Sequence, residues 1–195
     1  MSRPAHFDAF ARLLHWGMAM LVLAMLFIGV GMVASLTLRP VLLDLHRPVG
    51  AAILVLVAIR WLHRRRHPPP PLPADLPRLQ AVAAVVSHRL LYALMLAMPL
   101  LGASMLSAGG YPIRLVDSLQ LPALVPQDPL LYTVLRTAHG VGGYALFALV
   151  LLHVAGALYH AWVRRDGVFE SMARGGPSRK ARGEAGAPGA GTRTS

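Results

Sequence analysis

The sequence predicts an all-α membrane protein built as a bundle of four transmembrane helices. Hydrophobic residues make up 55% of the 195-residue chain, whereas charged residues make up only 14%. The mean hydropathy is positive, and the uncharged residues gather in long runs. So apolar a chain is not typical of a soluble domain. Intrinsic disorder, a soluble sandwich and a collagen-like rod are therefore excluded.

Three of the four spans follow from runs without acidic or basic residues. Residues 13–38, 90–113 and 137–163 form such runs, of 26, 24 and 27 residues. Each run exceeds the roughly 20 residues needed to cross the hydrocarbon of a bilayer. We therefore predict spans over residues 10–36, 82–107 and 134–163. The first run is longer than the roughly 7–15 apolar residues of a secretory signal, so the first span is expected to be retained.

A further span over residues 41–63 is less obvious. Only 12 uncharged residues separate Arg47 from Arg60, a length that alone suggests a core helix. However, Asp44 and Arg47 lie one turn apart and can pair, and Arg60 is near enough to the helix end to snorkel. We predict that this segment also crosses the membrane. The alternative is a protein with three spans.

The distribution of basic residues supports four spans and indicates their orientation. With four spans, both termini and the 60–89 segment share one side, which carries 15 of the 19 Lys and Arg residues. The opposite side holds only Arg39, Arg47, Arg114 and Arg136. By the positive-inside bias, both termini are expected in the cytoplasm. The net charge of +11 thus indicates a membrane protein rather than a nucleic-acid binder.

The segments between and after the spans have distinct compositions. Residues 67–73 are rich in proline and form a stiff inner connection. In the outer loop, residues 113–121 are predicted to form a short amphipathic helix that could cover a cofactor. Residues 7–172 are assigned to the membrane domain. Residues 173–195 have a composition with little to bury, and are predicted to form a disordered basic cytoplasmic tail.

Four of the nine histidines stand out because they lie away from the basic ends of the predicted spans: His15, His46, His139 and His153. Ionisable groups inside a bilayer are costly and usually mark function. His139 and His153 are 14 residues apart, so they share one helix face at about 21 Å separation. Span one enters from the cytoplasm and span two from outside. The sequence therefore predicts an inner pair, His15 with His153, and an outer pair, His46 with His139.

A pair of imidazoles on facing helices is the ligand set of a six-coordinate b-type haem. The chain has no cysteine, which excludes cysteine-ligated iron–sulfur clusters and the attachment motif of c-type haem. Zinc or copper would normally need further ligands, and the first, third and fourth spans contain no Asp or Glu. We predict one b haem at each pair, although a satisfied polar contact is the alternative for any one histidine alone.

Glycines follow these histidines at helical spacing. They are Gly50, Gly142, Gly143 and Gly156, each three or four residues after a histidine. They either clear space for a porphyrin or allow close packing of helices, and the sequence does not separate the two interpretations.

Several charged or titratable side chains at the two levels are candidate contacts of haem or quinone. Guanidinium groups match haem propionates, although such residues more often only set topology. The candidates are Arg12, Arg60 and Arg89 at the inner level and Arg47 and Arg136 at the outer level. For His88 and His160, contact with lipid headgroups is favoured over a quinone contact or proton transfer.

Further sequence features accompany these histidines. They are Arg12-Leu-Leu-His15-Trp16, Leu45-His46 through Arg60-Trp61 with the following proline-rich turn, Ser87-His88-Arg89-Leu-Leu-Tyr92, Pro99 with Gly102, and His139 with His153 and His160. In these features the sequence resembles the bacterial cytochrome b561 family over roughly residues 7–172. The resemblance implies four membrane helices, two b haems and His15, His46, His139 and His153 as axial ligands. The Gly-rich stretch after His139 and the longer basic tail depart from the family pattern.

Two imidazoles per iron leave no open coordination position, so electron transfer is expected rather than oxygen activation. Small stand-alone members of the family look like superoxide oxidases, which implies superoxide as donor, ubiquinone as acceptor and a bacterial inner membrane as location. The outer segments carry four Arg and three Asp, a net +1 that attracts an anionic donor only weakly. One alternative is an anchor subunit that links quinone to a partner dehydrogenase or hydrogenase. The other is a non-redox membrane protein that binds a transition metal.

Overall fold

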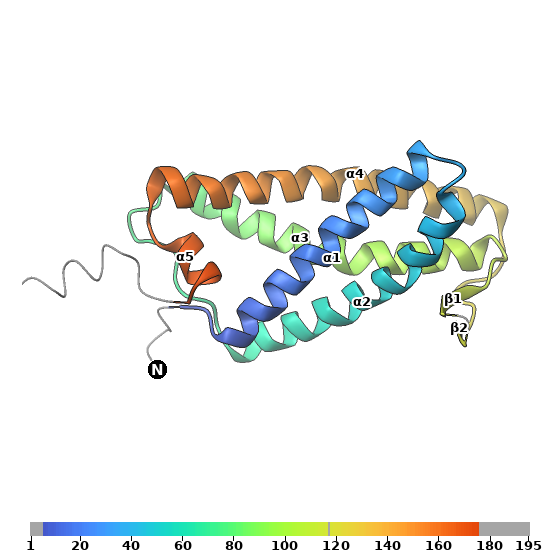
Figure 1. Ribbon diagram of the computed structural model, residues 1–195, viewed down its shortest axis with the longest axis horizontal. Helices are drawn as coiled ribbons and strands as arrows, with labels where there is room; N and C mark the ends of the chain where they lie inside the picture. The colour runs from blue at the N-terminus through green and yellow to red at the C-terminus, as the bar shows by residue number, and fades with distance from the viewer. Residues whose placement is uncertain (1–5, 117, 176–195) are drawn as a thin grey trace, which may run out of the picture.

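The computed structural model describes residues 6–116 and 118–175, which include four long helices in an elongated bundle (Figure 1). All four are long and apolar enough to cross a membrane, so the four-span prediction is confirmed. The predicted tail lies outside the described residues from position 176 onward. The helices are α1 (Ala9–Ala34), α2 (Arg39–Arg66), α3 (Arg78–Ala108) and α4 (Pro129–Tyr159).

Local sequence signals set the starts of the helices. Asp8 caps α1, because its carboxylate accepts a hydrogen bond from the backbone N–H of Ala11 at 2.9 Å. Asp128 caps α4 in the same way, at 2.7 Å from the N–H of Leu131. Proline stands in the first turn of both α2 and α4, where its missing N–H removes no intrahelical bond.

The bundle consists of two closely packed helical hairpins. α1 packs along α2, and α3 packs along α4, whereas α1 touches α4 at few points. The buried core is correspondingly small and includes Leu14, Met18 and Val22 of α1 with Ile53 and Val57 of α2. Most other apolar side chains are exposed, as expected of helices whose outer faces meet lipid. The histidine pairs described below lie between the two hairpins.

The outer loop forms a small β-hairpin, so the predicted helix over residues 113–121 is wrong. Strand β1 (Ile113–Val116) pairs antiparallel with β2 (Leu119–Leu121), and Ile113 lies opposite Leu121. Only nine residues separate Pro112 from Pro122, too few for a helix that is stable by itself. Burial of Ile113, which is 4% exposed, anchors the hairpin against the ends of α2 and α3.

At the inner end, α4 continues beyond the membrane-spanning length and the chain then folds back. A π-helical turn, η1 (His160–Arg164), follows α4, and α5 (Val168–Ala173) comes after a tight reversal. Arg165 and Gly167 have φ angles of 53° and 82° in this reversal. The indole of Trp16 in α1 donates a hydrogen bond to the carbonyl of Met172 at 3.3 Å. This contact ties α5 to the inner half of α1 (Figure 1).

Candidate functional site

The outer histidine pair joins α2 and α4. The ring centres of His46 and His139 are 6.0 Å apart, with an angle of 63° between the ring planes. The Nδ1 atom of each ring is buried and makes no hydrogen bond of ordinary geometry. Buried polar atoms nearly always have a partner, so the surrounding side chains alone do not satisfy these two imidazoles, and the pair has capacity left for a further group.

The inner histidine pair joins α1 and α4. The ring centres of His15 and His153 are 6.2 Å apart, with 71° between the ring planes. The two rings reach the same depth because α1 begins early, at Ala9, and because the helical chain of α4 continues through η1. The predicted pairs are therefore brought together at both levels.

His88 of α3 is a third imidazole at the inner level. Its ring centre is 5.2 Å from that of His153. Its Nδ1 lies 2.6 Å from the carbonyl oxygen of Ala84. Because a carbonyl only accepts, Nδ1 carries the hydrogen and Nε2 is left as the acceptor. His88 is thus packed against the inner pair, at a place where only lipid contact was favoured from the sequence.

In each pair, the distance between the two rings fits one haem iron between them. With metal–nitrogen bonds of about 2 Å on each side and the radius of each ring added, two axial imidazoles have ring centres about 6 Å apart. The observed distances of 6.0 and 6.2 Å match this value. Within the described part of the chain, no group of three or more His, Asp or Glu side chains could hold a bare metal ion. Each pair therefore offers a metal two nitrogen ligands, one from each imidazole.

Gly102 of α3 brings a helix backbone against the outer pair. A Cβ atom at this position would lie 3.2 Å from Cε1 of His139, which is closer than side chains normally pack. The glycines singled out from the sequence behave differently. A Cβ at Gly142 would meet Sδ of Met98 at 2.7 Å, whereas one at Gly156 would meet nothing within 4 Å. Gly142 therefore serves close packing of α4 on α3.

Arg60 links three helices at the inner level. Its Nε donates a hydrogen bond to the Tyr92 hydroxyl at 3.0 Å, and its Nη1 donates one to the carbonyl of Ala11 at 3.0 Å. Ala11 lies one helical turn before His15. The Arg60 guanidinium is therefore held next to the inner pair, as a propionate contact requires.

Arg47 is the corresponding residue at the outer level. It forms the predicted ion pair with Asp44, at 3.6 Å, and its Nε is buried without a hydrogen-bond partner. Arg47 follows His46 directly in the sequence. A donor without a partner beside the outer pair fits a propionate of a bound haem.

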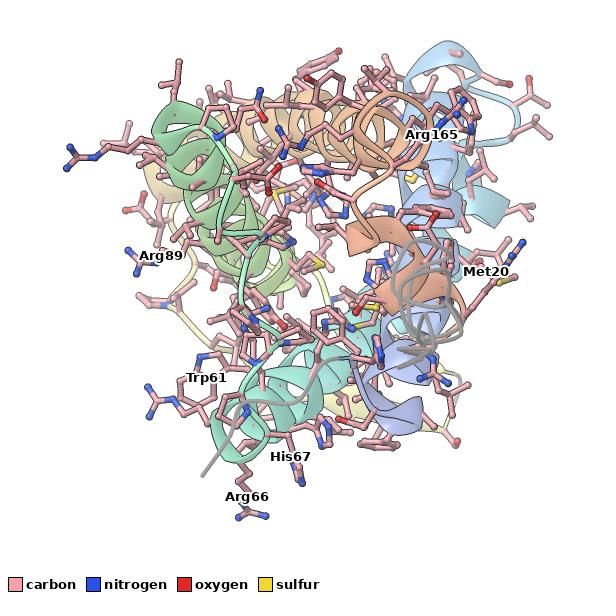
Figure 2. All side chains as sticks on the ribbon, turned by 90° about the vertical axis from the view of Figure 1, so that its left-hand side faces the viewer. Met20, Trp61, Arg66, His67, Arg89 and Arg165 are labelled. Carbon is pink, nitrogen blue, oxygen red and sulfur yellow. The ribbon has the colours of Figure 1, made fainter. Side chains whose placement is uncertain are left out.

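The other three candidate arginines are engaged or directed elsewhere. Arg12 donates to the carbonyl of Phe7 at 2.8 Å. Arg136 is exposed and donates to the hydroxyl of Tyr132 at 3.0 Å. Arg89 points away from the centre of the bundle (Figure 2). The structure therefore brings Arg60 and Arg47 to the histidine pairs, but not Arg89.

His160 belongs to an ion-pair network beyond the end of α4. Its Nδ1 lies 2.7 Å from Oδ2 of Asp166, which also accepts a hydrogen bond from Nε of Arg164 at 3.0 Å. Arg164 extends the network to Asp75 in the proline-rich connection, at 2.8 Å. Burial raises the pKa of Asp166. The hydrogen bonds from His160, Arg164 and Val168 together lower the pKa by more than burial raises it, so the pKa of Asp166 is below its ordinary value.

We expect the Asp166→Asn variant to be less stable than wild type at neutral pH. Hydrogen bonds to a charged group contribute about 1.5–3 kcal/mol each. Because the pKa of Asp166 is lowered by folding, this contribution is present above the ordinary pKa of 3.8 and is lost as the pH falls through the folded-state pKa. Thermal unfolding followed by circular dichroism at pH 7 and pH 3 should show a smaller deficit at pH 3 than at pH 7.

The matched control for Asp166→Asn is Asp75→Asn. The Asp75 side chain is 78% exposed, and exposed ion pairs contribute little. We expect this variant to unfold close to the wild-type temperature at both pH values. An equal deficit in the two variants, or a deficit of Asp166→Asn that does not become smaller as the pH falls from 7 to 3, would contradict the assigned role of the Asp166 carboxylate.

A histidine cluster at the inner ends of α1 and α2 was not singled out from the sequence. The rings of His63 and His67 stack with centres 4.3 Å apart, and Nε2 of His63 lies 2.9 Å from Oδ2 of Asp8. A cavity of about 20 Å³ separates them from Arg60 and Tyr92, room for about one water molecule. The four-residue spacing of the two histidines could have predicted that their rings lie on one helix face. The contact of His63 with Asp8 could not be predicted in this way, because it depends on how α1 and α2 pack.

Known proteins resemble this chain over most of its length. A family model described as prokaryotic cytochrome b561 matches residues 6–175. Cytochrome b561 homolog 2 of Escherichia coli (strain K12) is 26% identical over 176 residues, which cover 87% of this chain and 92% of that protein. Cytochrome b561 homolog 1 of the same organism is 24% identical over 129 residues, 66% of this chain and 73% of that protein. Probable superoxide oxidase CybB of Yersinia pestis is 29% identical over 161 residues, with coverage of 82% and 90%.

Proposed function

Because this chain belongs to the prokaryotic cytochrome b561 family of haem-binding membrane electron carriers, we propose that it oxidises superoxide and reduces ubiquinone. The family implies haem b as the cofactor. The choice of superoxide as donor is supported by the relative named probable superoxide oxidase, which is 29% identical to this chain. Ubiquinone is the acceptor that completes the reaction.

We assign His46 and His139 as the residues that would hold an outer haem, and His15 and His153 as those that would hold an inner haem. The observation that carries this assignment is that α4 contributes one histidine to each facing pair, with ring centres 6.0 and 6.2 Å apart. When bound, two such six-coordinate haems would take up and release single electrons and leave no iron position open for oxygen.

The reaction balances with two superoxide anions for each quinone. Two superoxide anions lose one electron each and become two molecules of oxygen. Ubiquinone gains the two electrons together with two protons from the inner side and becomes ubiquinol. His88, packed against His153, and His160, hydrogen-bonded to Asp166, are the titratable side chains we assign to this proton supply.

The proposed orientation places both termini in the cytoplasm. It is supported by the excess of basic residues on the side of the termini, 15 against four. The outer face would then receive superoxide, and the arginines on that side, Arg39, Arg114 and Arg136, would attract the anion weakly. Asp44 and Asp128 reduce this attraction, and Asp117 lies outside the described residues.

The test uses purified protein with its haems in detergent, supplied with enzymatically generated superoxide and a short-chain ubiquinone. The expected result is reduction of haem b, followed by ubiquinol formation that superoxide dismutase abolishes. Ubiquinol should form at one molecule for every two superoxide anions consumed.

Haem that dithionite reduces but superoxide does not would reject the proposed donor. Reduction by a co-purified dehydrogenase or hydrogenase subunit would then favour the anchor-subunit function. Absence of haem from well-folded protein would instead reject the ligand assignment itself.

A further inference from the structure

A histidine and an aspartate are paired on the inner side of the inner histidine pair, where α4 ends. His160 follows His153 by seven residues, nearly two helical turns, so its side chain leaves the same face of the helix about 10 Å further toward the inner side. The side chains of His160 and Asp166 are only 16% and 9% exposed. The imidazole is thus largely shielded from water, but one edge still reaches it.

Three donors hold the Asp166 carboxylate in one orientation. Oδ2 accepts hydrogen bonds from Nδ1 of His160 at 2.7 Å and from Nε of Arg164 at 3.0 Å, and Oδ1 accepts one from the backbone N–H of Val168 at 3.3 Å. Burial raises the pKa of this carboxyl, but the hydrogen bonds lower it by more, so it is ionised at neutral pH. An ionised carboxylate only accepts. The hydrogen of His160 therefore lies on Nδ1, and Nε2 is the nitrogen left to take up a proton.

An irregular backbone brings these two residues together. On a continued α-helix, Asp166 would lie about 240° around the axis from His160, far from its ring. Instead His160 begins the π-helical turn η1, and Arg165 has a φ angle of 53°, a conformation that residues other than glycine seldom adopt. Both π-helical turns and strained backbone are frequent at functional sites. The reversal thus accepts strain and places a carboxylate on Nδ1.

We propose that Asp166 is a positioning residue that keeps the hydrogen of neutral His160 on Nδ1, so that Nε2 passes protons from the inner water phase to ubiquinone. This role rests on the proposed reduction of ubiquinone. In each transfer, the bond from Nε2 of protonated His160 to its hydrogen breaks, and that hydrogen bonds to a quinone oxygen. The neutral ring then takes a new proton from water at Nε2, and Asp166 stays ionised throughout. Each transfer supplies one of the two protons of ubiquinol, whose two electrons come from two superoxide anions.

The first test measures how fast a short-chain ubiquinone reoxidises purified protein with its haems, after reduction by dithionite and removal of the reductant without oxygen. No superoxide is present, so the result does not depend on the proposed donor. His160→Gln should slow reoxidation about 100-fold, the usual effect of losing a general acid. Asp166→Ala keeps the ring but not its orientation, and should slow it by a part of this, about tenfold. Asp166→Glu retains a carboxylate and should recover most of the rate.

The second test reads the position of the hydrogen by nuclear magnetic resonance of protein with ¹⁵N-labelled histidine. The spectrum is recorded with reduced, diamagnetic haem at pH 9, well above the ordinary imidazole pKa of about 6.5. The signals of His160 are those that disappear in His160→Gln. They should show the hydrogen on Nδ1 in wild type, and a shift toward Nε2 in Asp166→Ala.

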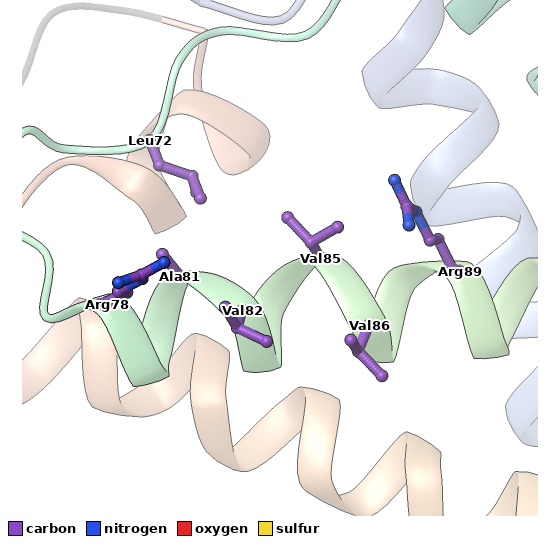
Figure 3. A pocket seen from close by; sticks show the side chains of 7 residues that line it. All are labelled: Leu72, Arg78, Ala81, Val82, Val85, Val86 and Arg89. Atoms are coloured by element: carbon purple, nitrogen blue, oxygen red, sulfur yellow. The ribbon is translucent and has the colours of Figure 1, made fainter.

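Asp75→Asn is the matched control. Asp75 belongs to the same ion-pair network, but its carboxylate contacts Arg164, at 2.8 Å, and is 78% exposed. It lies in the proline-rich connection, which borders a groove of about 390 Å³ where Leu72 points toward α3 (Figure 3). We expect Asp75→Asn to keep the rate and the tautomer of wild type. An unchanged haem spectrum verifies that each variant is folded.

Three results would overturn the role of Asp166 alone: a wild-type His160 with its hydrogen on Nε2, equal slowing in Asp75→Asn and Asp166→Ala, or reoxidation of Asp166→Ala at the wild-type rate. Wild-type haem that ubiquinone does not reoxidise would instead reject the proposed acceptor, and the role of Asp166 with it. The two failures are therefore distinguishable.

Discussion

Replacing His46 by alanine is expected to leave one b haem per chain in place of two. His46 and His139 supply the two imidazoles at the outer level, with ring centres 6.0 Å apart, and no other described histidine ring lies against this pair. Removal of one ring leaves a single axial ligand for the outer haem. The inner pair lies about 21 Å away along α4 and should keep its haem. The measurement is haem b per chain, with the reduced-minus-oxidised spectrum.

The reciprocal variant and a remote histidine complete this test. His153→Ala should also retain one haem, but with the spectrum and midpoint potential of the outer haem instead of the inner one. His67→Ala should retain both, since His67 stacks on His63 at the end of α2. If His46→Ala and His153→Ala each lost both haems equally, or if His46→Ala lost none, the two-pair assignment would be wrong.

The sequence could predict the two histidine levels because only helix geometry was needed. Fourteen residues separate His139 from His153, which fixes their common face and their spacing on one helix. Alternating entry of the spans then determines which helix supplies each partner. The structure places both predicted pairs within 6.2 Å between ring centres. The ligation of iron by these rings remains a prediction that the haem measurements test.

The depth of an arginine in the membrane was insufficient to predict whether it reaches a histidine pair, because its direction around the helix axis also matters. Arg89 has the right depth for the inner level, but it directly follows His88, and successive residues on an α-helix point about 100° apart. Since His88 faces His153, Arg89 points away from the centre of the bundle instead (Figure 2). Arg60 shows the converse case. Its contacts with Tyr92 and Ala11 come from two other helices, so they depend on packing that the sequence pattern does not specify.

The segments outside the membrane were the least predictable part of the fold. A helix was expected over residues 113–121 from its mixed polar and apolar residues, but so short a segment takes its structure from its neighbours. The hairpin there is stabilised by strand pairing and by burial of Ile113. Similarly, Asp166 meets His160 only because the chain reverses at Arg165 and Gly167. Neither contact follows from a periodic pattern.

Replacing Gly102 by valine is expected to weaken the outer haem selectively. A Cβ at Gly102 would already lie 3.2 Å from Cε1 and 3.5 Å from Nδ1 of His139, and valine adds two more methyl groups. The imidazole must then move from its position opposite His46. Overpacking of this kind costs about 1–3 kcal/mol, which corresponds to a roughly 5- to 150-fold weaker binding of the outer haem.

Gly140→Val is the matched control, because a Cβ at Gly140 would meet nothing within 4 Å although this glycine directly follows His139. Both variants place a β-branched residue in a membrane helix, so their difference reports contact with the ring rather than helix propensity. Titration of haem into the haem-depleted protein should show one weakened site in Gly102→Val and two intact sites in Gly140→Val. Equal weakening in both variants would mean that the close approach of α3 does not position His139, and weakening of the inner site alone would place Gly102 at the wrong level.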